Sequence, residues 1–249
     1  MASPLIDSNI FEVNNEANEL HEIGLKQELS QDFQSADLSF DQALNILSST
    51  TESELPEPDR KVQTGRILRD KGFNFIRFGI EEHNLGLFSD GYDDLNKSDS
   101  KLHSASGSLL MYSGILARDE IRDFEQSISA ERGATISLMA RAVTAREVIF
   151  EVRNGKNEAE RLYRKAHHNL TYGDNGYYRV SNAMVAARHE KINRQNTKMI
   201  QWLSKAVVGL GFTIFRDKKN LKPAVYTFGA RLLDLSSKSK AENSLKAKP

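Results

Sequence analysis

The chain has 249 residues, 39% of them hydrophobic and 27% charged, so it can bury a sizeable core and does not have the composition of a disordered chain. Cysteine is absent, which excludes disulfides, thiolate metal sites and a cysteine nucleophile. The net charge of zero hides an asymmetry: residues 1–60 hold thirteen acidic residues against Lys26 and Arg60, whereas residues 216–249 hold nine basic residues against three acidic ones.

Apolar residues recur at spacings of three and four along most of the chain, which is typical of amphipathic helices. No proline lies between Pro58 and Pro223, so long helices are permitted there. The pattern predicts helices over residues 12–29, 34–48, 60–78, 80–95, 101–117, 119–130, 134–153, 157–170, 178–192, 194–210 and 222–235. Turn-forming residues predict the connections at 48–59, 96–100, 154–155 and 172–176. Helices joined by short connections form antiparallel hairpins, which stack into an α-solenoid.

The sequence shows no recognisable targeting signal. The first residues have neither a basic region nor a long apolar run, so we expect no signal peptide. The longest apolar stretch, residues 206–215, is too short to span a bilayer. We therefore expect a cytoplasmic protein without a membrane segment.

Small and aromatic residues alternate at fixed offsets in two predicted second helices. Residues 140–173 carry Ala159, Tyr163 and Ala166, and residues 17–50 carry Ala36, Phe40 and Ala43 in the same arrangement. Small residues let two helices approach closely, and the aromatic residue between them fills the space toward the next hairpin. The pattern resembles the tetratricopeptide repeat, a helix–turn–helix unit of 34 residues. Glu147, where this family prefers Gly or Ala, departs from the pattern.

The resemblance implies an all-α, irregular α-solenoid of four or five repeats, with weaker matches near Gly65 and Val180 and a degenerate unit over residues 101–133. It divides the chain into an N-terminal arm (1–14), a repeat domain (15–213), a C-terminal capping helix (214–236) and a disordered basic tail (237–249).

Catalytic and metal-binding patterns do not stand out. His167 and His168 are adjacent, so on a helix they point about 100° apart and cannot easily share a metal ion. The acidic run at 89–94 lacks the register of a calcium-binding loop. The sequence therefore predicts neither an enzyme nor a cofactor or metal site, although an enzyme with an unrecognised site remains an alternative.

The resemblance assigns a ligand-binding role to the first helix of each repeat, whose face would be rich in arginine. The positions that it turns toward a common concave groove are Arg66, Arg69, Phe73, Ile76, Arg77, Arg141, Thr144, Val148 and Arg188. Guanidinium groups bind carboxylates in a bidentate manner, so the implied partner is an acidic or carboxyl-terminated peptide, or a partner helix. These arginines could instead be solvated or paired within the chain. A second alternative is a nucleic-acid-associated regulator that uses the basic C-terminal half; the oligomeric state stays open.

Overall fold

The computed structural model describes residues 12–109, 111, 116–152, 155–216 and 220–236. Within those residues the chain forms nine helices and no strand. The helices are α1 (Asn15–Leu29), α2 (Phe33–Ser49), α3 (Glu57–Glu81), α4 (Leu85–Leu109), α5 (Arg118–Ile149), α6 (Lys156–Tyr172), α7 (Gly176–Ile192), α8 (Asn196–Phe215) and α9 (Leu221–Ser236). The predicted all-α class is confirmed for this part of the chain.

The chain divides into two compact units, and the division falls inside the predicted repeat domain. The first unit is Leu5–Gly173 and contains α1 to α6, and the second includes Asp174–Pro249 and contains α7 to α9. The predicted arm and tail, residues 1–14 and 237–249, lie outside the described residues except for 12–14.

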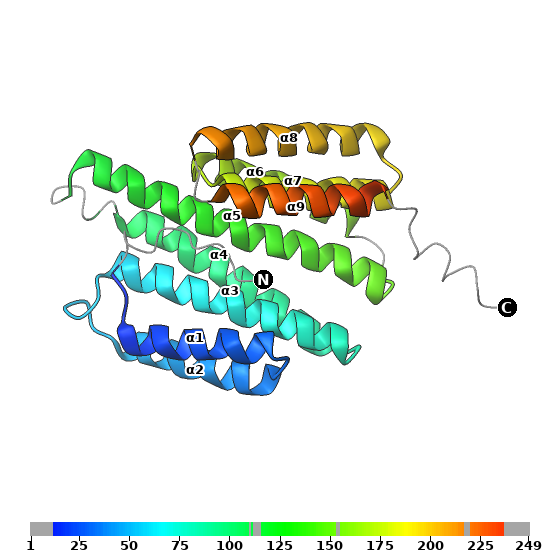
Figure 1. The fold of residues 1–249 in the computed structure, drawn as a ribbon. Coiled ribbons are helices and arrows are strands. Elements are labelled where there is room, and N and C mark those ends of the chain that lie inside the picture. The colour runs from blue at the N-terminus through cyan, green and yellow to red at the C-terminus, as the bar shows by residue number, and fades with distance from the viewer. Residues whose placement is uncertain (1–11, 110, 112–115, 153–154, 217–219, 237–249) are drawn as a thin grey trace. The chain divides into compact units, whose positions relative to one another are not determined.

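Neighbouring helices pack together within each unit. In the first unit α1 packs against α2, α3 against α4 and α5 against α6, and consecutive pairs are joined by contacts between α2 and α3 and between α4 and α5 (Figure 1). In the second unit α7 packs against α8, and both contact α9. The pairing agrees with the predicted hairpins, whereas the type of repeat stays a prediction.

Several predicted helix boundaries are wrong, including the break predicted between residues 78 and 80, which lies inside α3. The predicted connection at 96–100 lies inside α4, because two of its polar residues, Ser98 and Asp99, bind neighbouring helices. Ser98 donates a hydrogen bond of 2.7 Å to the backbone oxygen of Gly65, and Asp99 accepts one of 3.0 Å from Arg132. The predicted break between residues 130 and 134 is also absent, since α5 is continuous through Gly133. Residues 101–133 therefore form no separate hairpin among the described residues. The predicted end of a helix at residue 210 is too early as well, because α8 continues to Phe215.

The small–aromatic–small residues are buried, as their role in helix packing predicts. Ala159, Tyr163 and Ala166 of α6 have at most 1% of their surface exposed. Ala36, Phe40 and Ala43 of α2 are equally buried, and the ring of Phe40 lies so close to Gly24 of α1 that a Cβ atom on that glycine would be 2.6 Å from the ring. In both pairs, small residues let the two helices approach.

Substitution of Ala166 by leucine tests this packing. Because Ala166 is fully buried, we expect Ala166→Leu to lower the free energy of unfolding by about 1–3 kcal/mol through overpacking. The matched control is Arg161→Leu, an exposed position on the same helix, where a change within about 0.5 kcal/mol is expected. Urea unfolding measures both. Equal midpoints for Ala166→Leu and the parent would contradict the packing of α6 on α5.

Candidate interaction surfaces

Three of the arginines predicted to line an open groove, Arg66, Arg69 and Arg77, are bound to carboxylates of the same chain. Arg66 and Arg69 lie one turn apart on α3, and both contact Glu131 of α5. The Nε atom of Arg66 lies 2.6 Å from Glu131 Oε1, and Arg69 forms an ion pair with the other carboxylate oxygen. Glu131 is 2% exposed. The predicted groove is therefore occupied at this level by an internal ion-pair cluster.

The electrostatics of this cluster favour the charged carboxylate. Burial alone would raise the pKa of Glu131, but the charges of Arg66 and Arg69 and their hydrogen bonds outweigh burial and lower it. Asp70 behaves in the same way: burial opposes its ionisation, and Arg69 and His21 together hold its pKa below the ordinary value. The carboxylates of Glu131 and Asp70 are consequently ionised near neutral pH.

The same cluster extends from α3 to α1. His21 Nε2 lies 2.9 Å from Asp70 Oδ2, and Asp70 Oδ1 accepts a hydrogen bond of 2.9 Å from Arg69. Further along the helices, Arg77 donates to Glu28 Oε1 at 2.6 Å. Three helices that the repeat register would turn toward a ligand, α1, α3 and α5, are thus connected to one another by ion pairs.

The remaining predicted ligand residues are not gathered into one open site. Ile76 is buried against Gly91 of α4, Phe73 is half-buried, and Thr144 donates to the backbone oxygen of Ala140. Arg141 is half-buried. Val148 is exposed on α5, and Arg188 is exposed on α7 in the other unit.

A different surface, which the sequence analysis did not single out, lies on α8. We define the α8 stripe as the exposed apolar residues on one face of this helix, with Ser204 and Gly211 between them. Its large members are 43% to 79% exposed: Ile200, Val207, Val208, Ile214 and Phe215. Their spacings of seven, one, six and one place them within about 120° of the helix circumference, at 100° per residue.

The opposite face of α8 is buried against α7. Its buried residues are Trp202, Ala206, Gly209 and Thr213. A Cβ atom on Gly209 would lie 3.3 Å from side-chain atoms of Arg179 and Val180, which shows how closely α7 approaches. The helix is therefore apolar on both sides although only one side is covered. Apolar helix faces are normally buried, whereas the α8 stripe stays exposed among the described residues.

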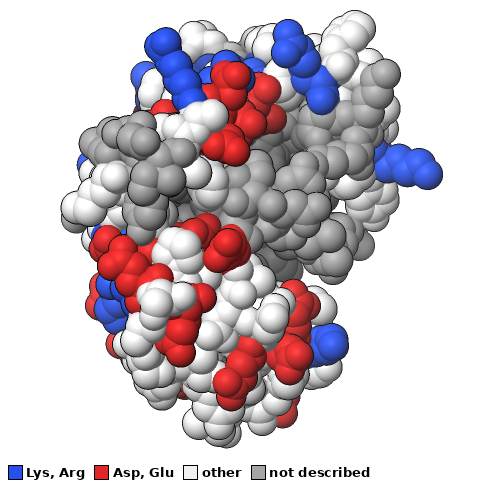
Figure 2. Space-filling view, turned by 90° about the vertical axis from the view of Figure 1, so that its left-hand side faces the viewer, with Lys and Arg blue, Asp and Glu red and all other residues white. Residues whose placement is uncertain are grey.

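The charge around the α8 stripe is positive. Residues 194–216 contain Arg194, Lys198, Lys205 and Arg216 and neither Asp nor Glu. Residues 174–249 as a whole hold fifteen basic residues against five acidic ones. The N-terminal part of the chain has the opposite charge. Figure 2 shows acidic side chains over the lower part of the view, where α1 and α2 lie. The α8 stripe is an apolar surface, and at 100° per residue the basic residues of this segment lie along one side of it.

The helix that follows shows a smaller exposed apolar set. Val225, Tyr226 and Leu232 of α9 are each more than 40% exposed, and Gly229 lies between them with open space at its Cβ position. The predicted capping role of α9 is consistent with its contacts to α7 and α8, but its outer face is not purely polar.

Metal and membrane sites find no support in the described part of the chain. There, no group of three His, Asp or Glu side chains is arranged to hold a metal ion. None of the described helices combines the length and apolar character that crossing a bilayer requires. Comparison with known proteins gives no assignment: no protein-family model matches the sequence, and a search of curated proteins finds no match.

Proposed function

We propose that this protein is a protein–protein interaction module and that its contact surface is the α8 stripe. The observation that carries the proposal is the row of five large apolar side chains exposed on a helix whose other face is already packed. Contiguous exposed apolar patches mark interaction sites in soluble proteins. Isolated exposed apolar residues, such as Leu38 on α2, need no such explanation.

The α8 stripe is a better candidate than the arginine-rich face of α3. A ligand carboxylate that binds Arg66 or Arg69 would have to displace Glu131, which is buried and holds both guanidinium groups. A partner of the α8 stripe displaces no carboxylate that the structure describes on this helix. The function class predicted from the sequence is therefore kept, and its proposed location moves from α3 to α8.

The chemistry of the surface supports an amphipathic helix with acidic residues beside its apolar face as the partner. The α8 helix has 20 residues, so a partner helix of about 30 Å matches its length. Ser204 and Gly211 are small, so a second helix can approach α8 closely at these positions. Val207, Val208 and Phe215 lie beside them and provide apolar contacts. Acidic residues on a flank of the partner would face the basic residues of α8 and accelerate association.

A designed pair of peptides tests this function. The probe is a helical peptide about 20 residues long, with leucine on one face and glutamate on its flanks; its partner peptide carries lysine in place of glutamate. Fluorescence anisotropy should show binding of the glutamate peptide and clearly weaker binding of the lysine peptide. Val208→Asp should weaken the glutamate complex about tenfold or more, since it places a charge at the centre of the contact.

The matched control is Leu38→Asp. Leu38 is 64% exposed and Val208 is 63% exposed, so the two substitutions remove equally accessible apolar side chains from different surfaces. Leu38→Asp should leave the affinity unchanged. Equal loss in both variants, or binding of anionic lipid vesicles with no binding of either peptide, would contradict the proposal.

A further inference from the structure

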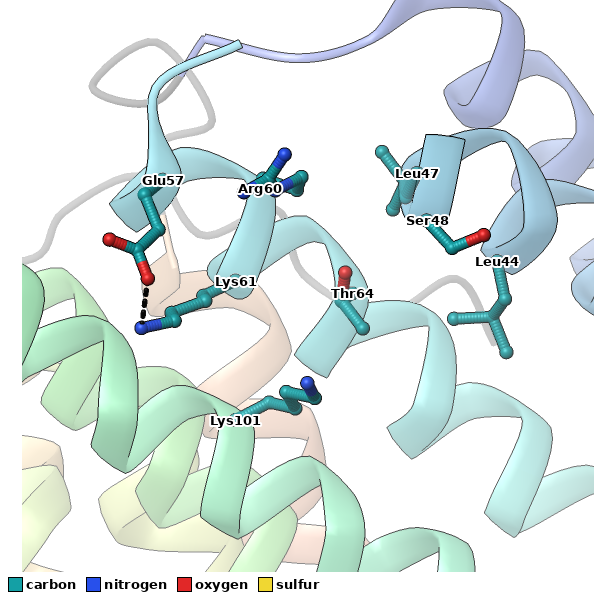
Figure 3. A pocket seen from close by; sticks show the side chains of 8 residues that line it. All are labelled: Leu44, Leu47, Ser48, Glu57, Arg60, Lys61, Thr64 and Lys101. Atoms are coloured by element: carbon teal, nitrogen blue, oxygen red, sulfur yellow. Dashed lines mark ion pairs between the residues drawn. The ribbon is translucent and has the colours of Figure 1, made fainter. Parts of the chain in front are cut away.

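A cavity of about 320 Å³ lies in the first unit, where α2, α3 and α4 meet. Leu44 and Leu47 line it from α2, Arg60 and Lys61 from α3, and Lys101 from α4 (Figure 3). Ligand pockets in proteins begin at about 300 Å³, so this cavity has room for a small molecule or a single side chain. It is separate from the α8 stripe, which belongs to the other unit.

The charges that line the cavity do not cancel. Lys61 is neutralised, because its Nζ atom lies 2.6 Å from Glu57 Oε1 and also donates to Ser108 Oγ at 2.7 Å. Arg60 donates to the backbone oxygen of Thr50, which fixes the side chain but leaves its charge. Neither Arg60 nor Lys101 forms an ion pair with any residue that the structure describes. Two positive charges thus remain at the cavity.

The wall opposite these charges is apolar. Leu47 is 1% exposed and belongs to the core cluster of the first hairpin, and Leu44 packs against the same cluster. In Figure 3 the two leucines project from α2 on one side of the pocket, while Lys101 rises from α4 beneath it. An inorganic anion would satisfy the cations and leave the exposed part of Leu44 against water, whereas an organic anion would contact both the cations and Leu44.

We propose that this cavity is a binding site for a carboxylate on a short aliphatic chain. The carboxylate lies between Arg60 and Lys101, and the aliphatic carbons lie against Leu44, which Leu47 supports from the core. The same chemistry occurs in a free small carboxylic acid and in the side chain of a glutamate on a peptide. Guanidinium and ammonium groups make charge-assisted hydrogen bonds with either source.

Titration of the ¹⁵N-labelled full chain, followed by amide chemical shifts, tests the site with butyrate, acetate and the neutral amide butyramide. Butyrate should shift the amides of residues that line the cavity and should saturate in the millimolar range. Acetate should bind about tenfold more weakly, because it lacks two methylene groups that meet Leu44. Butyramide, which has the same shape without the charge, should produce no saturable shift.

Two lysine variants test whether a cation that lines the cavity contributes to butyrate binding. Lys101→Gln removes a cation that lines the cavity, and we expect about tenfold weaker butyrate binding from the loss of one charge-assisted contact. Lys97→Gln removes an exposed cation one turn away on the same helix, outside the cavity, and should change the affinity less than twofold by our estimate. Both lysines lie on the surface of α4, so both variants are expected to fold.

A second titration of the labelled chain uses a short acetylated peptide that contains one glutamate. Binding of butyrate alone identifies a free carboxylic acid as the ligand, and binding of the peptide as well identifies a partner side chain; both results support the site. The proposal is overturned if butyramide binds as tightly as butyrate, if the two lysine variants lose affinity equally, or if no carboxylate shifts the cavity amides. Since α8 takes no part in these titrations, their failure would leave the function proposed for the α8 stripe intact.

Discussion

Glu131→Gln is expected to lower the free energy of unfolding by about 3–5 kcal/mol, the cost of removing one member of a buried ion pair. The carboxylate is 2% exposed and holds both Arg66 and Arg69. Glutamine has the same shape without the charge, so the two guanidinium groups would lose the anion that compensates their burial. Chemical unfolding followed by circular dichroism measures the change.

Asp123→Asn is the matched control for this substitution. Asp123 lies on the same helix, α5, but its side chain is more than half exposed, and we expect a change within about 0.5 kcal/mol. A Glu131→Gln variant as stable as the Asp123→Asn variant would show that the cluster contributes nothing to the fold. The same reasoning applies to the double change Arg69→Ala and Arg77→Ala, which should destabilise the chain because these side chains hold Glu131 and Glu28.

Gly91→Ala should destabilise the protein by at least about 1–3 kcal/mol, because α3 and α4 touch through their backbones at this point. A Cβ atom on Gly91 would lie 2.5 Å from the backbone oxygen of Gly72 and 2.8 Å from the backbone nitrogen of Ile76. The contact is reciprocal, since a Cβ atom on Gly72 would lie 2.7 Å from the backbone oxygen of Gly91. Backbone atoms cannot rotate away, so the helices would have to separate.

Gly107 provides a control on the same helix. It is exposed, and nothing lies within 4 Å of the position that its Cβ atom would take. Gly107→Ala should therefore raise stability by about 0.5–1 kcal/mol through its helix propensity. The two alanine substitutions are thus expected to have opposite signs. If Gly91→Ala also proved stabilising in thermal or urea unfolding, the close approach of α3 and α4 would be wrong.

The sequence predicted the helical class and the buried packing residues because both are recorded in local patterns. Apolar spacing at three and four depends only on the segment itself, and the small–aromatic–small pattern marks close helix contacts wherever it occurs. Helix boundaries were less predictable. Polar residues at 96–100 look like a connection, yet Ser98 and Asp99 bind partners on α3 and α5 that lie more than thirty positions away.

The candidate surface was less accessible to sequence reasoning than the fold. Whether an arginine on α3 is open or paired depends on Glu131, which is 62 positions from Arg69 along the chain and lies in a region without a recognisable repeat. The signal that was present in the sequence is the composition of residues 196–215, which are mostly apolar and include no acidic residue. Which face of this helix is covered follows only from the packing of α7.

Hydrogen exchange of the full chain, with and without the acidic amphipathic peptide, tests the central claim most directly. If the α8 stripe is the contact surface, the peptide should slow exchange of backbone amides within residues 200–215 and leave residues 57–81 unchanged. Slower exchange confined to α3, or no change anywhere at saturating peptide, would contradict the claim that this protein binds its partner through α8.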